Sequence, residues 1–100
     1  MSDKVVTIRA DKLNVGDIVN MTLYGLMNVE DGFEEVEIIK KPDVGVQEMR
    51  PSDRIVIKIV ETNETIEFRK NTSKPFFLIT DIMTKHGNTK QERVKFWKYA

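Results

Sequence analysis

The sequence predicts an all-β protein, either a small antiparallel barrel or a sandwich. Apolar and polar side chains alternate with a period of two over six or seven short segments, the pattern of strands with one buried face. Turn-forming residues separate these segments at intervals of about 8 to 14 residues, a spacing typical of small sandwiches and barrels. The chain contains no internal repeat and no linker, so residues 1–100 are expected to form a single domain.

Three strands are expected in the first half of the chain, over residues 4–10, 17–25 and 34–41. The first two are separated by the segment DKLNVGD, in which Asp, Asn and Gly favour turns. The second and third are expected to form a hairpin around Asp31-Gly32, because Asp-Gly is a strong signal for a tight turn.

The opening of the chain also resembles that of a known group of folds. A strand, the residues LNVGD and a second strand follow one another over about the first twenty residues, as at the start of many SH3-like small barrels. The resemblance implies an SH3-like barrel as the form of the all-β fold, and it assigns no activity.

The second half is expected to hold strands over residues 54–61, 65–70, 76–83 and 92–99, after an irregular segment at 42–53. The last of these carries conflicting signals. Thr89 and Glu92 match a capping box, which would start a short helix over 90–99. Against this, aromatic and β-branched residues alternate with basic ones, which favours a strand. We favour the strand and keep the short C-terminal helix as the alternative.

The alternation also assigns side chains to the core. The expected core residues are Val6, Ile8, Ile18, Ile55, Ile57, Ile59, Ile66, Phe68, Phe77, Ile79 and Phe96. Leu13 and Val15 are expected to fold back onto this core from the segment between the first two strands.

Net charge is zero, but the charges are unevenly distributed. Residues 1–50 hold 6 basic and 10 acidic side chains, and residues 51–100 hold 10 basic and 6 acidic ones. The chain has no cysteine and no apolar run of membrane-spanning length, and its first ten residues are not expected to act as a signal peptide. We therefore expect a cytoplasmic protein without a membrane partner, either a monomer or a homodimer.

Catalytic residue sets are scarce in the sequence. There is no cysteine and a single histidine, His86, in a loop that contains Gly and Lys. The sequence lacks a phosphate-binding loop, a G-x-G-x-x-G motif, an H-E-x-x-H motif and a G-x-S-x-G motif. We predict that the protein is not an enzyme and that it uses no metal ion or organic cofactor.

Nucleic-acid binding is the function favoured by the C-terminal segment RVKFWKYA. Small barrels bind nucleic acid by stacking bases on aromatic rings while basic side chains neutralise phosphates. The predicted contact residues are Arg93, Lys95, Trp97 and Tyr99, with electrostatic support from Lys85, Lys90 and Lys98. The competing interpretation is structural, with the two rings covering one end of a barrel and the lysines protecting an edge strand.

A protein-interaction module is the alternative function. The segment EDGFEEVE places an aromatic residue at an expected hairpin tip between carboxylates, a suitable contact for a basic partner. The residues of this alternative site are Glu30, Asp31, Phe33, Glu34 and Glu35. Such a module would act as an adaptor or as an inhibitor of its partner protein.

Overall fold

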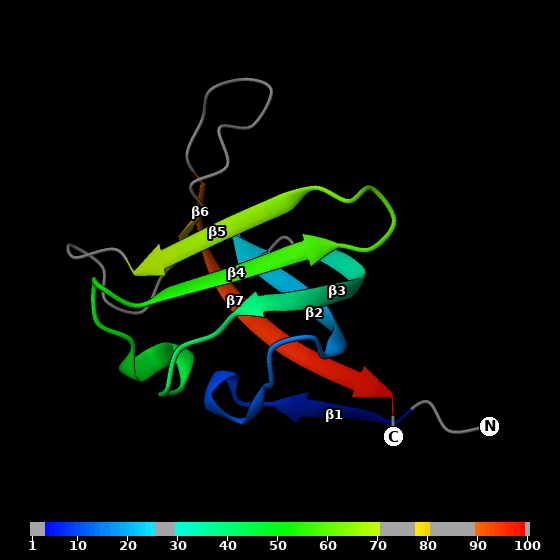
Figure 1. The fold of residues 1–100 in the computed structure, drawn as a ribbon, viewed down its shortest axis with the longest axis horizontal. Coiled ribbons are helices and arrows are strands. Elements are labelled where there is room, and N and C mark those ends of the chain that lie inside the picture. Colours follow the sequence, from blue (N-terminus) through cyan, green and yellow to red (C-terminus); the bar gives the residue numbers. More distant parts are fainter. Residues whose placement is uncertain (1–3, 26–29, 71–77, 81–89, 100) are drawn as a thin grey trace.

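The computed structural model describes residues 4–25, 30–70, 78–80 and 90–99, which form a seven-stranded antiparallel sheet (Figure 1). Its strands are β1 (Val5–Ile8), β2 (Ile18–Gly25), β3 (Glu30–Lys40), β4 (Arg54–Ile59), β5 (Thr65–Lys70), β6 (Leu78–Thr80) and β7 (Lys90–Tyr99). Two single 3₁₀ turns, η1 (Ala10–Lys12) and η2 (Val46–Glu48), interrupt the connections. Among the described residues, no helix is long and apolar enough to cross a membrane.

The all-β prediction is confirmed. Each expected strand has a counterpart in the sheet, although the first one ends at Ile8, before η1. The alternative of a C-terminal helix is wrong, because residues 90–99 form the strand β7. A strand forms here despite the match to a capping box, because β7 forms backbone ladders along both of its edges. Its β-branched and aromatic residues also suit a strand.

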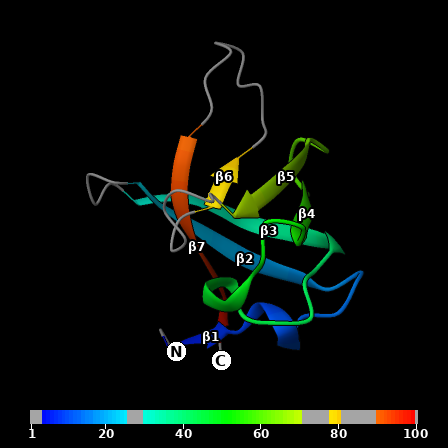
Figure 2. The same cartoon turned by 90° about the vertical axis from the view of Figure 1, so that its left-hand side faces the viewer.

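β7 pairs with three other strands. One edge pairs with β2, from Asn20↔Trp97 to Gly25↔Glu92. The other edge pairs with β1 near the C-terminal end, up to Val5↔Tyr99, and with β6 near the start of β7. The strand order is β1-β7-β2-β3-β4-β5-β6, with the additional pairing of β6 with β7. The resulting sheet is strongly curved, as the second view shows (Figure 2).

The β2–β3 pair differs from the hairpin that the sequence suggested. Asp31 and Gly32 lie inside β3, opposite Leu23 and Thr22, so the expected turn at Asp31-Gly32 is wrong. β3 begins at Glu30, four residues earlier than the expected strand. The hydrogen-bonded ladder with β2 therefore extends further than turn propensity alone indicated.

A β-bulge interrupts this ladder at Glu35. The register passes from Val19↔Val36 to Met21↔Phe33, so two residues of β3 face Asn20. Glu35 has a φ of 63°, in the left-handed region that non-glycine residues rarely adopt. Its amide donates to Asn20 Oδ1 at 3.0 Å, and its carbonyl accepts from the Val60 amide at 3.1 Å. Contacts with β2 and with the end of β4 therefore hold the strained backbone in place.

The core forms on the inner face of the sheet. Its buried residues are Ala10, Leu13, Val19, Met21, Leu23, Val36, Ile38, Met49, Ile55, Ile57, Ile59, Ile66, Phe68 and Phe96. The expected core positions in β4 and β5, together with Phe96 and Leu13, are confirmed. Ile8 is partly buried against this cluster. Phe77 and the side chain of Ile79 lie outside the described part of the structure.

Three expected core positions are wrong. Ile18 is 59% exposed, because β2 turns Val19, Met21 and Leu23 inward. The opposite phase would have buried the polar side chains of Asn20 and Thr22 without partners, which costs more than exposing one isoleucine. Val6 is 43% exposed, since it lies beyond the core opposite the exposed Lys98, and Val15 is 67% exposed before β2.

Lys70 connects the last residue of β5 to η2. Its side chain is buried, with 7% of the residue exposed, and Nζ donates to the carbonyls of Val46 and Gln47. These carbonyls belong to a short 3₁₀ turn that has few hydrogen bonds of its own. The buried ammonium group therefore fixes the otherwise irregular connection between β3 and β4 against the sheet.

An isoleucine-to-alanine substitution should lower the free energy of unfolding by different amounts on the inner and outer faces of the sheet. Replacing Ile57, which is fully buried, with alanine should lower the free energy of unfolding by about 2 to 5 kcal/mol, through lost burial and the cavity left behind. Ile18→Ala is the matched control and should change it by less than about 1 kcal/mol. Urea unfolding followed by far-ultraviolet circular dichroism measures both, and similar losses would contradict the strand phase described for β2.

The contact between Lys70 and η2 predicts a second stability difference. Lys70→Met keeps an unbranched side chain that is one atom shorter and removes the donor, so it should destabilise the fold by about 1.5 to 3 kcal/mol, the range for a hydrogen bond to a charged group. Lys58→Met, at a half-buried position in β4, is the control and should have little effect. Thermal unfolding of both variants tests this, and an unaltered melting temperature for Lys70→Met would show that the contact contributes nothing.

Candidate nucleic-acid interface

The predicted contact strip lies on β7, whose backbone extends from Lys90 to Tyr99. Phe96 points into the core and is 1% exposed, so Lys95, Trp97 and Tyr99 share the opposite, outer face. Lys95 and Trp97 are half-buried, and Tyr99 is 61% exposed. The strand thus brings two aromatic rings and one ammonium group to the same face, as its alternation predicted.

Trp97 is held by a specific hydrogen bond. Its indole Nε1 donates to the hydroxyl of Thr22 on β2 at 2.7 Å. The Trp97 and Tyr99 rings meet edge to face, with centroids 5.2 Å apart and planes at 90°. This packing satisfies the indole N–H and orients the neighbouring phenol ring. Trp97 therefore supports the surface, while Tyr99 is the ring with the more accessible surface.

The neighbours of these side chains come from β1 and β2. In the register, Val5 pairs with Tyr99, Thr7 and Asn20 pair with Trp97, and Thr22 pairs with Lys95. We call the outer surface formed by Val5, Thr7, Asn20, Thr22, Lys95, Trp97 and Tyr99 the β7 face. The sequence did not indicate its β1 and β2 members, because no local pattern shows which strands flank β7.

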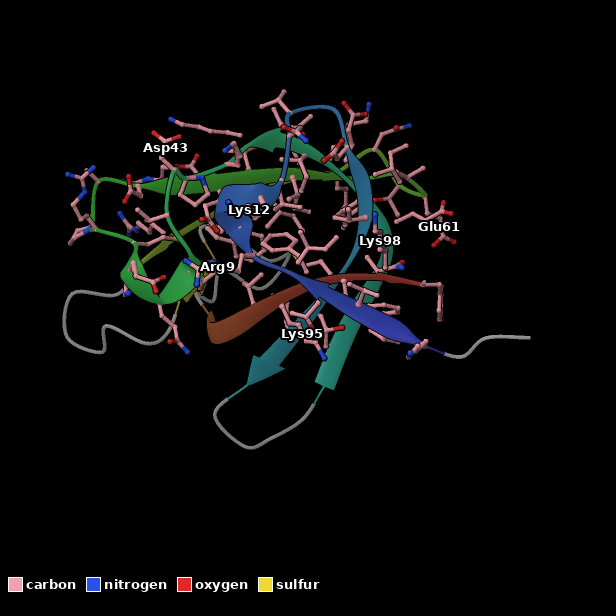
Figure 3. The ribbon with its side chains drawn as sticks, turned by 90° about the horizontal axis from the view of Figure 1, so that it is seen from below. Arg9, Lys12, Asp43, Glu61, Lys95 and Lys98 are labelled. Atoms are coloured by element: carbon pink, nitrogen blue, oxygen red, sulfur yellow. The ribbon has the colours of Figure 1, made fainter. Side chains whose placement is uncertain are left out.

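The supporting lysines do not all reach this surface. Lys98 is exposed on the other side of the strand from Lys95, as the view from below shows (Figure 3). Lys90 and Arg93 lie in β7, where Arg93 pairs with Tyr24 in the register. Lys85 lies outside the described residues. Among the described side chains, Lys95 is thus the basic group that β7 places beside Trp97 and Tyr99.

A hollow of about 340 Å³ lies next to the β7 face, between the end of β1, η2 and the middle of β7. Arg9 lies at this hollow, but its Nε bonds Asp11 at 3.0 Å and its guanidinium lies 3.6 Å from Glu48. Burial opposes ionisation of Asp11, yet the hydrogen bond and the charge of Arg9 outweigh it and lower the pKa of this carboxyl. The Arg9 cation is therefore already neutralised and is a poor site for an anion.

The alternative acidic site was predicted at the tip of a hairpin, and its residues do not lie at such a tip. Phe33 lies within β3 and pairs with Met21, so its expected position at a hairpin tip is wrong. Glu30, Asp31 and Glu34 are also part of the β3 strand. Glu35 is exposed and sits at the bulge.

The basic residues near β4 and β5 are largely engaged within the fold. Arg54 Nε contacts the Glu67 carboxylate at 3.0 Å, and Arg50 lies 3.6 Å from Asp53. Lys70 is buried against η2. Because these cations already have partners within the protein, this side of the sheet is less suited to bind phosphates.

Comparison with protein-family models, with curated proteins and with solved structures finds no match for this chain. Within the residues that the structure describes, no group of three or more His, Cys, Asp or Glu side chains could hold a metal ion.

The Trp97–Thr22 hydrogen bond predicts a measurable coupling. Trp97→Phe and Thr22→Val each remove one partner, and the double variant should be more stable than additive losses would give. The coupling energy should be about 0.5 to 1.5 kcal/mol, the net value of one such bond. Urea unfolding of the four proteins in the cycle measures it, and strictly additive losses would show that the two groups do not interact.

Proposed function

We propose that the protein is a small non-enzymatic binding module that contacts nucleic acid through the β7 face. The supporting observation is the placement of Lys95, Trp97 and Tyr99 on one outer face of β7, with Tyr99 61% exposed. An exposed aromatic ring can stack on a base, and an adjacent ammonium group can neutralise the phosphate that follows. Trp97 keeps the Tyr99 ring in place through their edge-to-face contact.

The proposed ligand is a single strand. Stacking on a protein ring requires an unpaired base, because bases in a duplex are already stacked and paired. Each such stack contributes about 1 to 3 kcal/mol by alanine substitution. The electrostatic contribution is small, since the protein carries no net charge and Lys95 is the basic side chain described on this face. Affinity should therefore depend on Tyr99 more than on charge.

We also propose that the sheet is a small barrel of the SH3-like type. The pairings that run from β2 through β3, β4, β5 and β6 lead to β7, which itself pairs with β2. Such a circuit of pairings supports a barrel.

Binding of short labelled oligonucleotides to the full chain tests the proposed function. Fluorescence anisotropy at low salt should show that single-stranded DNA or RNA binds more tightly than the matching duplex. Tyr99→Leu should weaken binding by about 1 to 3 kcal/mol, which is the contribution of one base stack. Lys95→Gln should weaken binding and also reduce the salt dependence by about 0.7 in the log–log slope, the contribution of one phosphate on a single strand.

Lys40→Gln provides the charge-matched control, because Lys40 is exposed at the end of β3 and lies outside the β7 face. It should leave the affinity for single strands unchanged. All variants must retain the β-rich circular dichroism spectrum of the parent. Absence of binding to any oligonucleotide at low salt would overturn the proposal, and equal losses for Lys40→Gln and Lys95→Gln would show that the β7 face is not the contact surface.

A further inference from the structure

A second hollow, of about 250 Å³, lies where β7 ends and β2 begins. Its lining residues are Ile18, Val19, Asn20, Glu35, Lys98 and Tyr99. Tyr99 therefore belongs both to the β7 face and to this hollow. A strand that stacks a base on Tyr99 would bring that base or its neighbour to the opening of the hollow.

The backbone explains why a hollow forms here. The ladder between β2 and β7 starts at Asn20↔Trp97, although β2 extends back to Ile18 and β7 continues to Tyr99. At the same level the β3 bulge displaces Glu35 from the regular register. Loss of strand pairing on one side and the bulge on the other leave space between the strands.

The hollow contains opposite charges that do not neutralise each other. Glu35 and Lys98 both line it, but they form no ion pair with each other or with another residue that the structure describes. Asn20 also lines it, and its Oδ1 already accepts the Glu35 amide hydrogen. The Asn20 amide NH₂ is therefore the part of this side chain suited to donate to a ligand.

We propose that this hollow is a guanine-selective subsite that adjoins the β7 face at Tyr99. The inference rests on the proposed nucleic-acid function. Guanine presents two adjacent donors, N1–H and the N2 amino group, which suit the two oxygens of the Glu35 carboxylate. Its O6 and N7 acceptors suit the Lys98 ammonium group, the kind of donor that proteins use for these atoms. Tyr99 supplies the aromatic surface beside the base.

The other bases fit these charges less well. Adenine places the N1 lone pair where Glu35 requires a donor, and cytosine presents the N3 and O2 acceptors there. Uracil and thymine offer a single N3–H between two carbonyls. A carboxylate facing an acceptor loses its hydration without gaining a hydrogen bond, so these bases are disfavoured as well as less attracted.

Competition between matched oligonucleotides tests the subsite on the full chain. Oligothymidine with one central guanine should bind about 5- to 150-fold more tightly than the same strand with adenine, the discrimination of one bidentate pair. Hypoxanthine, which lacks the N2 amino group, should give an intermediate affinity. Glu35→Gln keeps the side-chain shape and removes one acceptor, so it should abolish the preference for the guanine strand over the adenine strand.

Asp43→Asn is the matched control, because Asp43 is exposed on a loop remote from Lys98 (Figure 3). It should retain the full preference for guanine. Equal affinity for the guanine and adenine strands would overturn the subsite while the proposed function stands. Preference retained in Glu35→Gln would likewise overturn the role of Glu35. If no oligonucleotide binds the parent protein, the proposed function and the subsite both fail.

Discussion

The ladders that β7 forms with three other strands are the constraint on which most of the structure depends. β7 joins β1, β2 and β6, and Phe96 in its middle is almost fully buried. Its inner face contributes to the core while its outer face carries Lys95, Trp97 and Tyr99. Successive side chains of a strand point to opposite faces. The backbone hydrogen bonds that hold β7 in the sheet therefore also position the side chains of its outer face. A change of register by one residue would expose Phe96 and bury a lysine.

Specific polar contacts stabilise the parts of the fold where regular pairing is interrupted. Asn20 accepts the backbone amide of the bulged Glu35, and Lys70 donates to the carbonyls of η2. In each case one side chain from a strand satisfies backbone groups of an irregular neighbour. The candidate base subsite lies at the first of these positions. The polar groups that it offers are therefore held by rigid elements and not by a long loop.

Local alternation was sufficient to predict the strands and the inward faces of β4 and β5, where Ile55, Ile57, Ile66 and Phe68 are buried. It also predicted the two faces of β7. It failed at Ile18, where the polarity of the whole face determines the phase, and at Asp31-Gly32, where pairing with β2 overrides turn propensity. The hollow beside Tyr99 could not be predicted, because it depends on where the β2–β7 ladder stops and on the bulge in β3. Such features arise from tertiary pairing and leave no periodic signal in the sequence.

The pairing of β1 with β7 has a consequence for the time course of folding. Val5 and Tyr99 are neighbours in the sheet although almost the whole chain separates them. Contacts of such sequence separation require a large loss of chain entropy before they are formed, and they slow folding. During synthesis, β2 would expose the edge that later receives β7 until residues 90–99 have left the ribosome. During that interval the nascent chain presents an unpaired strand edge, and it is then most prone to aggregation.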